Sequence, residues 1–248
     1  MNKNLSYGDF AYIYDALTDD VEYEKRCDYI EKIFSLHLKS KPNLIADLAC
    51  GTGTVCTIMS ERGYDCIGID SSDMMLDVAA EKNKDGRILY LNQDICEFEL
   101  YGTVDCFLCM LDSINYLTCD GDLDALFSLV HNYLNPGGLF VFDVNTLFKY
   151  REILSDNTFV YENNDIFYTW ENCFDGMYCD FRLNFFVGEN GIYHRFTEEH
   201  TQRFYSAEYI KSCLKKSGLV LRNIYGDMSF ENPAENDERI FFVVQKCE

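Results

Sequence analysis

Residues 44–53 constrain the fold of this chain more than any other stretch. The apolar run LIADL spans residues 44–48, and Gly51 and Gly53 follow it. This order is typical of a buried strand, a tight turn and a helix that starts near Thr54. Glycines let the backbone approach a ligand closely, and the free N–H groups of a new helix point toward it. The stretch therefore predicts a nucleotide-binding turn.

The spacing of this turn limits the ligand. A dinucleotide fingerprint has a small residue three positions after its second glycine, but Cys56 stands there. Asp47, at the strand end, would repel a pyrophosphate and attract an α-amino group. A ligand that combines adenosine with a positively charged amino acid satisfies both observations, and S-adenosylmethionine is such a ligand. A nicotinamide-dependent oxidoreductase is the alternative on the same sheet topology.

Two motifs and their spacing resemble those of a known family. Residues 47–53 (DLACGTG) and 66–76 (CIGIDSSDMML) are similar to the first two motifs of class I S-adenosylmethionine-dependent methyltransferases. Asp70 closes a second strand, where an acid can accept hydrogen bonds from both ribose hydroxyls, and Asp94 resembles the adenine-binding acid after a third. The resemblance extends to small-molecule N-methyltransferases such as glycine N-methyltransferase. It implies cofactor contacts from Tyr14, Tyr23, Asp47, Ala49, Gly51, Gly53, Asp70, Ser71, Met75, Asp94, Ile95, Leu111 and Ser113.

The resemblance also implies a fold. We expect an α/β, doubly wound, Rossmann-like sheet of seven strands, with the last strand antiparallel and a small inserted antiparallel β-sheet as a lid. Strands and helices alternate over residues 44–143, which predicts a parallel core with helices on both faces. Residues 219–226 and 239–246 would supply the last two strands. We expect a cofactor-binding domain at 1–156 and 206–248, and an inserted subdomain at 157–205.

Net charge and cysteine use limit the partners and the compartment. The 248 residues include 42 acidic and 21 basic ones, for a net charge of −21, which repels phosphate backbones and anionic lipid. We therefore expect no nucleic-acid or membrane partner, and a cytoplasmic protein. The 12 cysteines are scattered through apolar runs and are typical of buried thiols in a reducing compartment. The C-x-x-C formed by Cys106 and Cys109 lacks a second pair at metal spacing, so no metal is expected.

Three further segments concern the site. Residues 7–15 are rich in aromatics and precede a helix whose apolar face includes Tyr23; the resemblance implies that Tyr14 and Tyr23 contact the cofactor, and plain packing is the alternative.

A helix over 120–134 is expected to stop at the sequence NPGG (135–138), with a buried strand at 139–143. Between these segments, residues 110–117 turn from apolar to polar at a strand end, where ligands of α/β sheets bind. A helix cap by Asp112 or Ser113 is the alternative.

Residues 157–205 change character and predict three or four antiparallel strands, with hairpin turns at residues 175–176 and 190–191. They could form a lid, a plain sheet extension or a dimer surface. His194, Glu198 and His200 share the parity of one strand face, which left three possibilities open: a metal site, a solvated face, or a substrate contact by His200 or Arg203.

These observations together predict methyl transfer from S-adenosylmethionine to a small-molecule acceptor, by direct in-line attack on the sulfonium methyl. An amine fits best, because an acidic chain attracts a cation. Should the acceptor need a general base, Asp112, Tyr116 and His200 are the candidates. A non-catalytic module that binds the cofactor or S-adenosylhomocysteine and acts through a partner is a further alternative. The sequence leaves the acceptor and the oligomeric state open.

Overall fold

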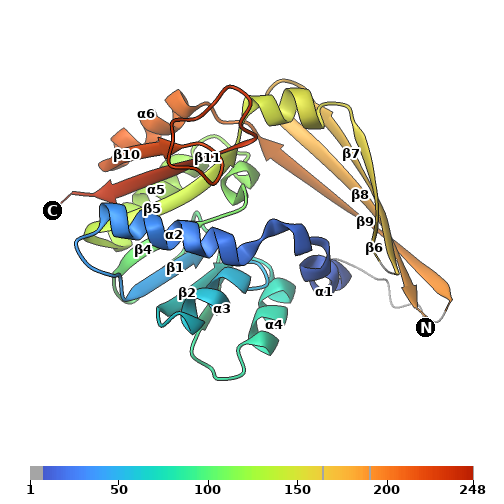
Figure 1. Ribbon diagram of the computed structural model, residues 1–248, viewed down its shortest axis with the longest axis horizontal. Helices are drawn as coiled ribbons and strands as arrows, with labels where there is room; N and C mark the ends of the chain where they lie inside the picture. The colour runs from blue at the N-terminus through green and yellow to red at the C-terminus, as the bar shows by residue number, and fades with distance from the viewer. Residues whose placement is uncertain (1–7, 164, 190, 248) are drawn as a thin grey trace.

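Two β-sheets organise the molecule (Figure 1). The computed structural model describes residues 8–163, 165–189 and 191–247. A seven-stranded sheet has the order β10-β11-β5-β4-β1-β2-β3, and a four-stranded sheet has the order β6-β7-β8-β9. The strands of the first sheet are β1 (Leu44–Leu48), β2 (Asp65–Asp70), β3 (Leu89–Asn92), β4 (Val104–Cys109), β5 (Leu134–Asn145), β10 (Leu219–Tyr225) and β11 (Arg239–Lys246).

The seven-stranded sheet confirms the predicted fold. All its neighbours pair in parallel except β11, which is antiparallel to both β5 and β10. On one face α2 (Tyr23–His37) and α3 (Thr54–Glu61) bury an apolar cluster, and on the other α5 (Asp122–Tyr133) and α6 (Ala207–Ser217) bury a second. The apolar runs of β4 and β5 lie between these clusters, so both faces of each strand are buried.

One expected boundary was wrong. The sequence NPGG at 135–138 was expected to separate helix from strand, but β5 begins at Leu134, directly after α5. Leu134 pairs with Val104, and the next pair joins Leu139 to Cys106, so the intervening residues form a bulge. A bulge accommodates the proline, which has no N–H to give to the ladder, and the glycine in the left-handed region, Gly137 (φ +78°).

The four-stranded antiparallel sheet was predicted between the fifth and sixth strands of the first. It comprises β6 (Thr158–Asn163), β7 (Ile166–Phe174), β8 (Tyr178–Glu189) and β9 (Ile192–Arg203), and a π-helical turn (Lys149–Leu154) leads into it. The turn at Asp175 and Gly176 is present, and Asp175 Oδ1 accepts hydrogen bonds from the backbone N–H groups of Met177 (2.8 Å) and Tyr178 (2.7 Å). Asn190, of the other expected turn, lies outside the described residues.

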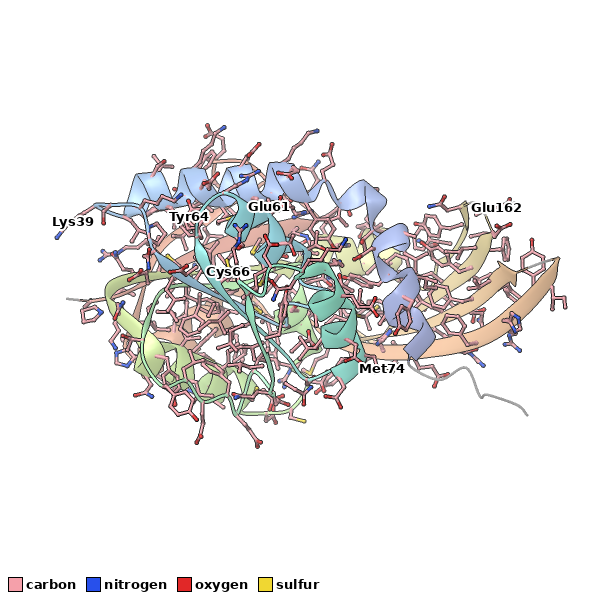
Figure 2. The ribbon with its side chains drawn as sticks, turned by 90° about the horizontal axis from the view of Figure 1, so that it is seen from below. Lys39, Glu61, Tyr64, Cys66, Met74 and Glu162 are labelled. Carbon is pink, nitrogen blue, oxygen red and sulfur yellow. The ribbon has the colours of Figure 1, made fainter. Side chains whose placement is uncertain are left out.

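The remaining helices are α1 (Gly8–Leu17), α4 (Asp73–Lys82) and two short 3₁₀ turns, Asp19–Val21 and Ser113–Tyr116. Helix α1 lies between α4 and the four-stranded sheet, beyond the carboxyl ends of the central strands (Figure 1). Tyr7, part of the predicted aromatic segment, lies outside the described residues. Figure 2 places Lys39, just after α2, and Glu162 on the four-stranded sheet at opposite ends of the molecule.

Gly68 of β2 is tightly packed against its neighbours. A Cβ added to Gly68 would lie 2.6 Å from ring carbons of Tyr90, its pairing partner on β3, and 2.8 Å from the Cys50 sulfur. Gly68→Ala is expected to destabilise the fold by about 1–3 kcal/mol, because overpacking forces neighbours to move. Urea unfolding would measure this. Gly102→Ala is the control, since a Cβ there meets no atom within 4 Å. A loss no larger than that of the control would contradict the packing argument.

Candidate cofactor and acceptor site

Three residues of the turn after β1 adopt the left-handed backbone conformation. Ala49, Gly51 and Gly53 have φ values of +55°, +54° and +71°. A Cβ at Gly51 would meet nothing within 4 Å, so open space lies beside this backbone. Gly53 N donates to the Cys50 carbonyl at 2.9 Å and closes the turn immediately before α3. The turn thus leaves room for a ligand where the helix begins.

Asp70 fixes this turn to the end of β2. Its two carboxylate oxygens accept backbone N–H bonds from Gly51 and Ser72, both at 2.8 Å. Each oxygen has more than one lone pair, so both can still accept a ribose hydroxyl. Ser71, beside it, is exposed, and Met75 in the first turn of α4 donates its N–H to Ser72 Oγ at 3.3 Å.

Asp47 is a buried carboxylate without a cation. Asp47 is 4% exposed, and the one hydrogen bond that its carboxylate accepts from a described residue is a weak one from the Cys56 thiol at 3.6 Å. Burial raises the pKa of Asp47 to about 7. Within the described residues no ion pair involves Asp47. A bound ammonium group would remove this penalty, and the α-amino group of S-adenosylmethionine is such a group.

The third predicted acid lies after β3. Asp94 is exposed, and its Oδ1 accepts the N–H of Cys96 at 2.7 Å, while Ile95 beside it is buried. The structure therefore brings Asp47, Asp70 and Asp94 to the carboxyl ends of three neighbouring strands. This arrangement fits an adenosine joined to an amino acid, with the charged end at Asp47.

Helix α1 contacts both the glycine-containing turn and α4. Asp15 accepts a hydrogen bond from Thr52 Oγ1 at 2.6 Å and forms an ion pair with Lys82 of α4. Tyr14 and Tyr23 are half-buried beside each other, and desolvation raises the pKa of both phenols, so both stay neutral. Contact of Tyr14 and Tyr23 with the cofactor stays a prediction.

The loop after β4 has an unusual backbone. Leu111 and Asp112 have φ values of +59° and +53°, a conformation that is strained for residues with side chains. Asp143, buried at the end of β5, accepts both of their N–H groups at 2.8 Å. Ser113 Oγ donates to the Met110 carbonyl at 2.8 Å, and Asp112 makes no side-chain cap. The helix-cap alternative for these two residues is therefore not what the structure shows.

Arg239 of β11 joins the same cluster. Its guanidinium forms ion pairs with Asp143 and with Asp112, the latter at 2.5 Å, and it is 7% exposed. Burial alone would raise the pKa of Asp112, but Arg239 and Lys149 outweigh it and lower the pKa. An ionised, paired carboxylate is a poor general base. We therefore assign Asp112 to positioning the loop rather than to proton transfer.

Gln202 connects this cluster to the four-stranded sheet. Its Nε2 donates to Asp112 at 2.5 Å, and its Oε1 accepts from Tyr150 at 2.8 Å and from Asn145 at 3.1 Å. Sequence reasoning missed Asp143, Arg239 and Gln202. An acid in the apolar run of β5 was the one available signal, since the partners come from strands distant in sequence.

His200 lies two residues before Gln202 on the same face of β9. Its ring centroid is 5.9 Å from that of Tyr116 and 6.0 Å from that of Phe10 in α1. Burial lowers the pKa of His200, so the imidazole is neutral near pH 7. The structure thus brings His200 and Tyr116 together at the active-site loop.

Two other candidates from this strand lie elsewhere. Arg203 is directed away, in an ion pair with Asp120 at 2.8 Å and against the ring of Tyr205, and His194 is exposed. In the part of the chain that the structure describes, no group of three or more His, Cys, Asp or Glu side chains is placed to hold a metal. Nor is any described helix long and apolar enough to cross a bilayer.

Comparisons with known proteins agree with this geometry. A family model described as a methyltransferase domain matches residues 45–138. The putative methyltransferase YqeM of Bacillus subtilis (strain 168) is 35% identical over 246 residues, which cover 98% of each chain. The chain belongs to the S-adenosylmethionine-dependent methyltransferases. A crystal structure of such an enzyme from Clostridium acetobutylicum ATCC 824 has a TM-score of 0.89 at 32% identity, covering 98% of this chain and 99% of that one.

A more distant relative is named for its acceptor. The glycine/sarcosine N-methyltransferase of Halorhodospira halochloris is 29% identical over 139 residues, 52% of this chain and 50% of its own. The predicted family, enzyme class and cofactor are confirmed, and the methyltransferase uses S-adenosylmethionine rather than a nicotinamide dinucleotide.

Cofactor affinity should depend on pH through Asp47. The free carboxyl has a pKa of about 7, and a bound ammonium lowers it, so binding releases a proton below pH 7. The Kd for S-adenosylhomocysteine should be roughly tenfold to thirtyfold weaker at pH 5.5 than at pH 7.5 by calorimetry. 5′-Methylthioadenosine, which lacks the amino acid, should show no such change, and neither should Asp47→Asn. Equal slopes for the two ligands would contradict this role of Asp47.

Removing Arg239 should cost much of the stability. Arg239→Met leaves Asp112 and Asp143 as buried, unpaired charges, a change that typically costs about 3–5 kcal/mol. Urea unfolding at pH 7 would measure it. Arg87→Met is the matched control, since Arg87 and its partner Asp85 are both mostly exposed and the loss there should stay within about 1 kcal/mol. Similar losses in the two variants would show that the buried cluster does not support the loop.

Proposed function

We propose that this methyltransferase transfers the methyl group to the nitrogen of a small-molecule amine. The observation that carries the proposal is the neutral imidazole of His200 beside Tyr116, in an aromatic setting next to the active-site loop. An amine reaches the protein as an ammonium ion and must lose a proton before its lone pair can attack. His200 is half-buried, and because its imidazole is neutral near pH 7, a ring nitrogen has a free lone pair that can accept this proton.

The bound cofactor supplies a methyl group that is already activated by the sulfonium charge. The protein therefore has to align the nucleophile and exclude water. Asp112, held by Arg239 and Gln202, fixes the backbone of the loop on which Tyr116 lies. Helix α1 covers the site through Asp15 and Phe10. The net charge of −21 attracts cationic acceptors.

The relative from Halorhodospira halochloris supports an amine, since it is named for N-methylation of glycine and sarcosine. The inserted sheet supports a small acceptor, because side chains of its inner face contact Phe10 of α1 and Tyr116 of the active-site loop. We propose that residues 157–205 form the lid over this acceptor. Proton transfer falls to His200 with Tyr116 beside it.

A screen of acceptors would test the proposal. The purified protein with S-adenosylmethionine should form S-adenosylhomocysteine when given primary or secondary amines, and not with alcohols or thiols of the same carbon skeleton. His200→Ala should lower kcat by about a hundredfold, the usual size of a proton-transfer contribution. His194→Ala, on the exposed part of the same strand, is the control and should retain activity. Turnover confined to alcohols or thiols would overturn the amine acceptor.

A further inference from the structure

The inner face of the four-stranded sheet carries one acidic residue whose role neither the fold nor the methyl-transfer site explains. This face turns toward α1 and the active-site loop, as the ring contacts of Phe10 with Phe185 (5.5 Å) and His200 (6.0 Å) show. On β9 it presents Phe196, Glu198, His200 and Gln202 in alternate positions. The neighbouring strands contribute mainly aromatic side chains to the same face.

Phe10 lies across Glu198. Three cross-strand pairs follow one another on this face: Phe185 with Phe196, Leu183 with Glu198, and Phe181 with His200. Because Phe10 contacts Phe185 in the first pair and His200 in the third, it covers the middle pair. This position explains why Glu198 is only 3% exposed on a strand whose other face is open.

The Glu198 side chain has no hydrogen-bonding or ion-pair partner among the described residues, and burial is the one cause that shifts its pKa. Gln202 is bonded at both ends of its amide, and His200 packs between two rings, but no hydrogen bond or ion pair joins Glu198 to any residue in the ranges that the structure describes. Burying an unpaired carboxylate is costly, and burial raises the pKa of Glu198. An apolar residue would pack better among these aromatics, so packing does not account for a glutamate here.

The spacing along β9 sets what Glu198 can reach. Gln202 contacts Asp112 at the active-site loop, and His200 contacts Tyr116. Glu198 is the next residue on the same face, about 7 Å beyond His200 for a step of two strand residues. A ligand whose reacting atom lies at His200 and Tyr116 would therefore meet Glu198 with a group some distance from that atom.

We propose that Glu198 binds a second cationic group of the methyl acceptor, so that the acceptor is a molecule with two amino groups rather than one. The inference rests on the proposed amine acceptor and specifies its class. Glu198 does not suit the reacting nitrogen itself, because an ion pair would keep the proton on that nitrogen and withhold its lone pair. The aromatic neighbours favour the same ligand, since ring faces attract organic cations.

Two probes that differ in one amino group test the proposal. The protein saturated with S-adenosylhomocysteine would be titrated calorimetrically with 1,5-diaminopentane and with pentylamine, whose carbon chains are the same. The diamine should bind about tenfold to a hundredfold more tightly, the effect of one hydrogen-bonded ion pair. Glu198→Gln should remove this difference. Glu199→Gln is the matched control, because Glu199 is the adjacent residue on the exposed face and its removal changes the net charge equally.

Glu198→Leu serves as a second variant with a side chain suited to the aromatic face, and thermal unfolding would confirm that each variant is folded. Equal binding of the two probes to the wild type, or a preference that survives in both Glu198 variants, would overturn the proposal and leave amine methylation standing. A preference that depends on Glu198, without S-adenosylhomocysteine formation from any amine, would instead overturn the proposed function and the acceptor role together. Diamine turnover that Glu198→Gln reduces selectively would support both.

Discussion

The active site depends on one buried guanidinium. Arg239 forms ion pairs with both Asp143 and Asp112, and Asp143 in turn holds the strained backbone of Leu111 and Asp112 through their N–H groups. Without the positive charge, two carboxylates would face each other in a desolvated space, at a cost of several kcal/mol. Because Gln202 donates to the same Asp112, this charge also fixes where the inserted sheet meets the parallel core. The loop, the parallel core and the inserted sheet are therefore joined by one ion-pair cluster.

The carboxylates around the site fall into two groups according to whether the protein itself supplies a cation. Asp112 has Arg239, and its pKa is lowered despite burial. Asp47 and Glu198 are buried without a cation, and their pKa values are raised. A protein gains nothing in stability from an unpaired buried acid. We propose that these two acids bind positively charged groups of the ligands, Asp47 that of the cofactor and Glu198 that of the acceptor.

The cofactor half was predictable from the sequence because its signals are local. Asp47, Gly51 and Gly53 lie within one turn, and Asp70 follows at the end of the next strand, so a local motif resemblance was enough to propose them as cofactor contacts. The ion-pair cluster was not predictable, because Arg239 reaches Asp112 across 127 positions of sequence. Asp112 could be assigned to the site, but its engagement with Arg239 and Gln202 appears only once β11 and β9 are placed. The early start of β5 was also missed, because a proline normally argues against a strand and the bulge that accommodates Pro136 depends on pairing with β4.

The inserted sheet was predictable in part from local patterns and in part only from tertiary contacts. Alternation and hairpin turns predicted its strands, and residues 194, 198 and 200 share the parity of one face. Parity alone did not decide between a metal site, a solvated face and a substrate contact. In the structure the three residues differ in exposure and in their neighbours. His194 is exposed at the far end, His200 lies between Phe10 and Tyr116, and Glu198 lies beneath Phe10. Since Phe10 belongs to α1, the helix that also bonds the glycine turn through Asp15, the cover over the acceptor side and the cover over the cofactor are one element. The proposed cofactor turn and the proposed acceptor site therefore share α1 as a neighbour.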